Sequence, residues 1–81
     1  MPIPGELYTV TQGTYIGSNY VCIHTTKDQC SFLELNEMKN VHLSTDDVQI
    51  GITNKILELL ENIPVDIMDV CKAQYEKNIN N

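Results

Sequence analysis

Two cysteines and two histidines in the middle of the chain are, by residue type, the best candidates for binding a metal ion. Cys22 and His24 lie two residues apart and would share one face of a strand, while Cys30 and His42 come from later segments. Zinc prefers thiolate and imidazole ligands, but its sites usually draw them from two close pairs. Because only one close pair is present, we expect half-buried strand residues, with no metal and no other cofactor.

The same cysteines could also pair with each other. Cys22 and Cys30 would lie on adjacent strands, near enough for a disulfide if the geometry allowed it. Together with Cys71 they make three cysteines, and an odd number does not fit a secreted disulfide framework. We therefore expect a reducing, cytoplasmic environment in which the thiols pack as small apolar side chains. A metal or thiol sensor using Cys22, His24 and Cys30 remains an alternative.

Acidic side chains occur in near pairs that resemble a solvated surface more than a catalytic site. The pairs are Asp46 with Asp47, Glu58 with Glu61, and Asp66 with Asp69. Acid–base catalysis needs two carboxyl groups whose surroundings push their pKa values apart, whereas these pairs look equivalent. The segment from Gly13 to Gly17 matches no phosphate-binding motif, and no Ser, His and Asp grouping stands out. We therefore expect that the protein is not an enzyme.

The charge balance argues against nucleic acid and membranes as partners. The 81 residues include 11 acidic and 5 basic side chains, which gives a net charge of -6, and every basic residue is a lysine. Nucleic-acid binding needs clustered lysine and arginine, and anionic membrane surfaces favour the same residues. No apolar run approaches the roughly 18 residues of a membrane helix, and the start does not resemble a signal peptide.

The first half of the chain has patterns typical of β-strands. Apolar and β-branched residues alternate or cluster over 6–11, 20–25, 30–35 and 38–43, at intervals of about ten residues. The connections are too short for parallel crossovers. This spacing predicts a small antiparallel β meander or an SH3-like barrel.

Helical spacing dominates the second half. Ser44 can cap a helical turn over 45–48. Apolar residues at alternate positions then predict a closing strand over 49–52. Apolar residues at helical spacing predict a helix over 53–63. A proline separates it from a second amphipathic helix that reaches to about residue 78.

These elements predict one α+β domain over residues 1–81. The part over about 6–52 is expected to be β-rich, and a C-terminal helix pair over about 53–78 is expected to cover the sheet. The residues expected to fill the core are Val21, Ile23, Leu33, Leu35, Val41, Ile56, Leu60, Met68 and Cys71. A homodimer formed through a helix face or a strand edge would stabilise a protein with so small a hydrophobic core.

Two surface features are candidates for binding a protein. Tyr15 and Ile16 stand between glycines, where they would form an exposed apolar tip. The chain from residue 45 onward carries seven acids and three lysines, and an acidic helix face could dock on a basic groove. The residues predicted to bind a partner are Tyr15, Ile16, Glu58, Glu61, Asp66 and Asp69.

The sequence thus predicts a small acidic accessory or regulatory protein that binds a protein partner with a basic surface and inhibits or modulates it. In size and composition alone, it is similar to small phage-encoded or mobile-element proteins that inhibit host or defence enzymes, which would place it in the host cytoplasm. The alternatives are a nucleic-acid-mimicking inhibitor of a DNA-binding host or defence enzyme and a structural subunit of a viral assembly. A small-molecule pocket where Tyr20, His24 and Tyr75 converge also stays open.

Overall fold

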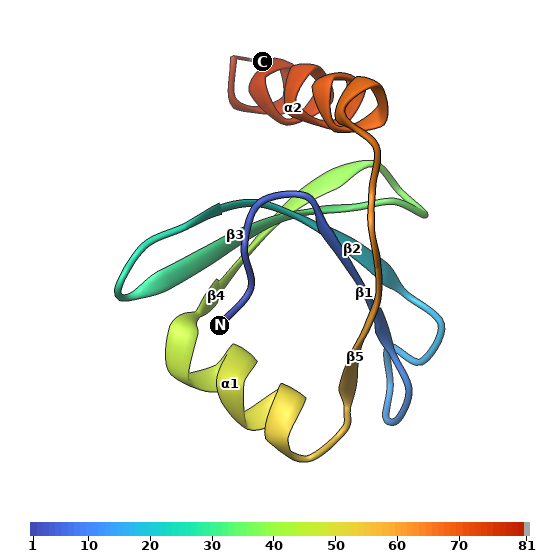
Figure 1. The fold of residues 1–81 in the computed structure, drawn as a ribbon, viewed down its shortest axis with the longest axis vertical. Helices are drawn as coiled ribbons and strands as arrows, with labels where there is room; N and C mark the ends of the chain where they lie inside the picture. Colours follow the sequence, from blue (N-terminus) through green and yellow to red (C-terminus); the bar gives the residue numbers. More distant parts are fainter. Residues whose placement is uncertain (81) are drawn as a thin grey trace.

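A computed structural model describes residues 1–80 as a curved antiparallel sheet with a helix on each side (Figure 1). The strands are β1 (Glu6–Val10), β2 (Asn19–Thr25), β3 (Gln29–Glu34), β4 (Lys39–Ser44) and β5 (Leu57–Asn62), and the helices are α1 (Thr45–Thr53) and α2 (Val65–Ile79). The strand order is β4-β3-β2-β1-β5. The first four strands form a meander, and β5 returns to pair with β1. The predicted α+β class with an antiparallel meander is confirmed.

Helix α1 covers the concave side of the sheet, which we call the inner face. The inner core consists of Tyr8, Cys22, Cys30, Phe32 and Val48, with Tyr20, Ile52 and Leu57 packed at its margin. These strand residues share one face because side chains alternate along each strand and cross-strand partners point the same way, as the pairs Tyr8 with Tyr20 and Cys22 with Phe32 illustrate. The two buried cysteines therefore behave as small apolar side chains, as expected.

Helix α2 packs on the convex side, the outer face. The outer core consists of Val21, Leu33, Met68 and Cys71, flanked by Leu7, Ile23, Leu35 and Ile63. Figure 1 shows α2 lying across this side of the sheet, away from α1. Within residues 1–80, no helix is long and apolar enough to cross a membrane.

The predicted core is right for the strands and for α2, and wrong in the segment between them. Val21, Leu33, Met68 and Cys71 are buried, and Ile23, Leu35 and Val41 are half-buried. Ile56 and Leu60 are exposed, since they do not lie on the helix that was expected to bury them.

The closing strand predicted over 49–52 is instead part of α1. Apolar residues at 48, 50 and 52 gave the segment an alternating pattern. In the helix Val48 is buried and Ile50 points outward. The end of α1 is set by Asn54, whose backbone N–H donates to the Ile50 carbonyl, and by Lys55 at a φ of 59°, a left-handed conformation that a helix cannot continue through.

The helix predicted over 53–63 is also wrong, because most of this segment is β5. The strand covers an edge of β1 that would otherwise be unpaired. Its register shifts between the pairs Leu7–Glu61 and Tyr8–Leu59, so Leu60 is an extra residue at a bulge. The adjacent Leu59 and Leu60, which read as one face of a helix, are consequently both exposed. The helix after Pro64 is confirmed as α2.

Ser44 links the sheet to α1, and its replacement should weaken that link. The Ser44 hydroxyl accepts a hydrogen bond from the Asp47 backbone N–H at 3.1 Å, so it satisfies a donor that the first turn of a helix leaves free. We expect Ser44→Ala to lower the free energy of unfolding by about 1 kcal/mol, measured by urea denaturation. The matched control is Ser18→Ala, since Ser18 caps no helix. Equal stability of wild type and Ser44→Ala would contradict this role.

Candidate functional site

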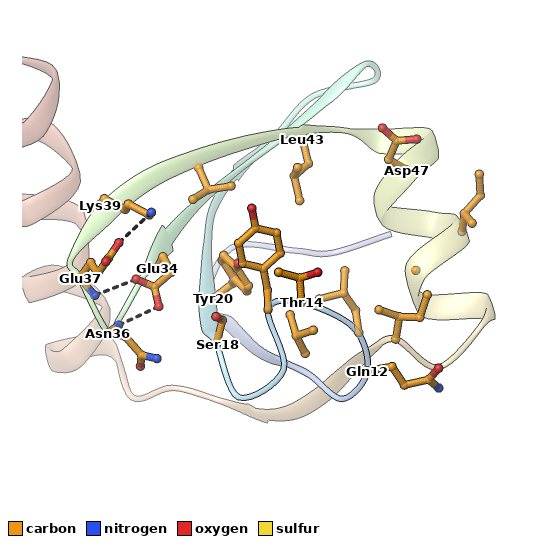
Figure 2. A pocket seen from close by; sticks show the side chains of 17 residues that line it. Gln12, Thr14, Ser18, Tyr20, Glu34, Asn36, Glu37, Lys39, Leu43 and Asp47 are labelled. Atoms are coloured by element: carbon orange, nitrogen blue, oxygen red, sulfur yellow. Dashed lines mark hydrogen bonds and ion pairs between the residues drawn. The ribbon is translucent and has the colours of Figure 1, made fainter.

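A groove of about 770 Å³ opens on the inner face, between β4, α1, the start of β5 and the loop from β1 to β2. Figure 2 shows Leu43 of β4 and Asp47 of α1 along one side, and Gln12, Thr14 and Ser18 of the loop on the other. The groove lies between β4 and β5, the two edge strands, which are not paired with each other. The groove therefore runs along the gap between β4 and β5, which would be closed if these strands paired to complete a barrel.

Strand β4 supplies one wall of the groove through every second residue. Lys39, Val41 and Leu43 line it, and alternation puts their side chains on the inner face. Their β3 partners are Glu34, Phe32 and Cys30. The wall is apolar at Val41 and Leu43 and charged at Lys39, near the β3–β4 turn.

Helix α1 and the start of β5 form a second wall of the groove. Ile50 lies here with 58% of its surface exposed, and Ile56 follows just before β5. Gly51 allows the helix to approach Leu57 closely, because a Cβ atom at this position would lie 3.2 Å from a Leu57 methyl carbon. The wall thus presents apolar side chains that the fold itself leaves uncovered.

The loop between β1 and β2 brings Tyr15 to the groove. Gly13 and Gly17 adopt positive φ angles of 90° and 88°, which favour glycine. The Gly17 N–H donates to the Val10 carbonyl at 2.9 Å and the Ser18 N–H to the Tyr15 carbonyl at 3.0 Å. The loop is therefore held by backbone hydrogen bonds, yet 68% of the Tyr15 surface is exposed. The expected exposure of Tyr15 and Ile16 is confirmed.

Charged groups gather at the β3–β4 end of the groove, as the dashed lines in Figure 2 show. The buried carboxylate of Glu34 accepts hydrogen bonds from the backbone N–H groups of Asn36 at 2.9 Å and Glu37 at 2.7 Å. Lys39 Nζ lies 2.7 Å from Glu37 Oε2. This hydrogen bond and the charge of Lys39 lower the pKa of Glu37, and the same contact raises the pKa of Lys39.

Comparison with known protein families, with curated proteins and with solved structures gives no match for this chain.

The predicted partner-binding residues fall into two separate regions. Tyr15 lines the groove, and Ile16 is exposed beside it on the same loop. The four acids lie outside the groove, Glu58 and Glu61 on β5 and Asp66 and Asp69 on α2, all of them exposed. The residues that sequence reasoning missed are Leu43, Ile50 and Ile56. Their exposure depends on where α1 and β5 lie, which the sequence pattern did not give.

The cysteines and histidines weighed as metal ligands lie on opposite faces of the sheet. A register shift between Cys22 and His24 places a bulge between them, so His24 pairs with Ser31 on the outer face while Cys22 stays in the inner core. The expectation that the two share one strand face is therefore wrong. In the described part of the chain no group of three His, Cys, Asp or Glu residues could hold a metal ion, and Cys22 and Cys30 are both free.

His42 is exposed on the outer face, where it contacts β3 and α2. Its Nδ1 lies 3.0 Å from the Ser31 hydroxyl, and its ring meets Tyr75 edge-on with centroids 6.1 Å apart. Ser31 is buried, and its contact with His42 joins β3 to β4, while the ring contact with Tyr75 joins β4 to α2. Tyr20 packs against the inner core, whereas Tyr75 belongs to α2 on the outer face, so the pocket of Tyr20, His24 and Tyr75 that the sequence left open does not form.

Buried acidic protons should make the fold sensitive to alkali. Burial raises the pKa of the Cys22 and Cys71 thiols above 9.0. Burial, and next the hydrogen bond to Glu6, raise the pKa of Tyr8 well above its ordinary range. The native state keeps these protons while the unfolded chain releases them near its ordinary values, so stability falls as pH rises above about 9. We expect the urea midpoint to be lower at about pH 10 than at neutral pH; an unchanged midpoint would contradict this.

Proposed function

We propose that this protein is a small acidic regulatory protein that binds a protein partner in the groove and thereby inhibits or modulates it, without catalysis. The observation that carries the proposal is the set of uncovered apolar side chains that converge on one groove, namely Tyr15, Leu43, Ile50 and Ile56. Apolar surface gathered in a concave site is typical of a binding site, whereas single exposed apolar residues are ordinary. We further propose that the protein works in the cytoplasm, in the host cytoplasm if it is phage-encoded.

The charges of the groove favour a partner that is basic as well as apolar. Glu34, Glu37 and Asp47 line it, and Lys39 is its one basic side chain among the described residues. Lys39 is already paired with Glu37. The chain as a whole carries a charge of -6. A lysine or arginine on the partner would therefore be attracted both by the carboxylates of the groove and by the negative charge of the whole chain.

Selection of peptides on wild-type protein and on matched variants tests this proposal. Random displayed peptides of about ten residues, longer than the six residues of β4, are selected on immobilised protein and re-tested on two variants. Ile50→Asp puts a charge in the groove, and Ile67→Asp changes an isoleucine of similar exposure (48% against 58%) on α2. Both sites are exposed, so circular dichroism is expected to show both variants folded.

We expect the selected peptides to bind the wild type and Ile67→Asp alike and to lose binding to Ile50→Asp. If no peptide is enriched, or if the enriched peptides bind Ile50→Asp as well as the wild type, the groove is not the binding site.

The four predicted acids outside the groove are proposed to speed association rather than to contact the partner in the groove. Changing Glu58 and Glu61 to glutamine and Asp66 and Asp69 to asparagine removes four negative charges, from -6 to -2. We expect association with a basic selected peptide to slow by about tenfold at low salt, and the difference to shrink at high salt. Surface plasmon resonance measures both rates. An unchanged association rate at low salt would remove these acids from the mechanism.

A further inference from the structure

We propose that the partner segment binds in an extended conformation, as an added strand on the free edge of β4, with alternate side chains in the groove. This inference rests on the proposed function and specifies the chemistry of the occupant. The occupant is a peptide segment of a protein partner that carries apolar residues at every second position and a lysine or arginine. Three features of the described residues support it.

The first feature is the free hydrogen-bonding edge of β4. The Thr45 backbone N–H donates to the Asp28 carbonyl at 3.0 Å. Because hydrogen-bonded and non-hydrogen-bonded residue pairs alternate along antiparallel strands, this bond shows which pairs of β3 and β4 are hydrogen-bonded. The pairs Leu43–Cys30 and Val41–Phe32 are then hydrogen-bonded pairs. The N–H and C=O groups of the residues between them, Asn40 and His42, therefore point away from β3. In an edge strand these groups are available to another strand.

The second feature is the position of the groove directly along that edge. Lys39, Val41 and Leu43 point their side chains into the groove. The backbone N–H and C=O groups of Asn40 and His42, which lie between them, face the gap between β4 and β5. A strand that pairs with Asn40 and His42 would place the side chains opposite Lys39, Val41 and Leu43 on the same inner face. Main-chain bonds would then give affinity, and the groove would select alternate side chains.

The third feature is the charge at the two ends of this wall. Glu37 with Glu34 stands at the β3–β4 end, and Asp47 of α1 stands at the other, as Figure 2 shows. Between them the groove is lined by the apolar side chains of Val41, Leu43 and Ile50. The complementary segment therefore has apolar residues opposite the middle of β4 and a basic residue at an end.

Backbone N-methylation of a selected peptide tests strand addition. A single methyl group on a peptide nitrogen removes one donor and leaves the side chain unchanged. We take the tightest peptide whose binding is lost with Ile50→Asp, and methylate each nitrogen in turn. Strand addition predicts a loss of at least about tenfold at alternate positions over a stretch of residues, with little change at the positions between them. The sensitive positions should be those whose side chains are tolerant of alanine.

The possible results separate the two proposals. An alternating methylation pattern supports strand addition. Equal effects at all positions, or none, in a peptide that still requires Ile50 would overturn strand addition and leave the groove as the binding site. If no selected peptide requires Ile50, the proposed function fails as well. A dimer in sedimentation that Ile50→Asp dissociates would mean that a second copy occupies the edge, and would also overturn the proposal.

Discussion

Replacing Phe32 by alanine is expected to lower the free energy of unfolding by about 3–5 kcal/mol. Phe32 is among the largest fully buried side chains, it lies in the inner core, and its ring meets Tyr20 edge-on with centroids 5.9 Å apart. Val48 of α1 and the inner-face residues Tyr8 and Cys22 share its core cluster, so removing the ring leaves a cavity between the helix and the sheet. A chain of this length has a total stability of roughly 4–12 kcal/mol. The substitution is therefore expected to remove a large part of the stability of the fold.

Urea denaturation followed by circular dichroism measures this loss. Ile79→Ala serves as the control, since it shortens an exposed apolar side chain at the end of α2, and it is expected to change stability by less than about 0.5 kcal/mol. A loss below about 1 kcal/mol for Phe32→Ala would show that the inner core does not hold the sheet and α1 together.

Replacing Tyr15 by alanine is expected to weaken binding of a groove-dependent peptide by about thirtyfold without changing stability. Tyr15 is the aromatic side chain most exposed in the groove, and the loop that carries it is fixed by backbone hydrogen bonds. An ordered, exposed aromatic at the centre of a binding site typically contributes about 2 kcal/mol or more, which corresponds to about thirtyfold. Because the side chain is exposed, its removal leaves no cavity.

Titration calorimetry with the selected peptide gives the affinity, and thermal unfolding gives the stability. Ile16→Ala is the matched control, because Ile16 lies on the same loop and is equally exposed but does not line the groove. Equal affinities for wild type and Tyr15→Ala would contradict the role given to Tyr15. Equal losses from Tyr15→Ala and Ile16→Ala would instead place the contact at the tip of the loop.

The first four strands could be predicted because their patterns are local. β-branched residues favour a strand over 20–25, and alternating polar and apolar residues favour one over 30–35. The observed β2 and β3 differ from these ranges by at most one residue at each end. The segment between β4 and α2 could not be predicted in this way. Its apolar residues fit a strand where a helix forms, and a helix where a strand forms, because pairing with β1 and contact with the inner core decide the outcome.

The candidate site was only partly visible in the sequence. Tyr15 stood out because flanking glycines and a short apolar pair mark an exposed bend. Leu43 and Ile50 gave no such signal, since an apolar residue near the end of a strand or inside a helix is usually buried. Likewise, the bulge that separates Cys22 from His24 has no sequence signature, so the two residues were expected on one face.

Methyl chemical shifts in the presence of a groove-dependent peptide give the most direct measurement of where this protein binds a partner. The chain carries isoleucine, leucine and valine on both sides of the sheet, so one spectrum reports on the groove and on α2 together. We predict that the methyl groups of Leu43, Ile50 and Ile56 shift strongly as peptide is added, while those of Ile67 and Val70 stay in place. Shifts confined to Ile67 and Val70, with the groove methyl groups unmoved, would contradict the account.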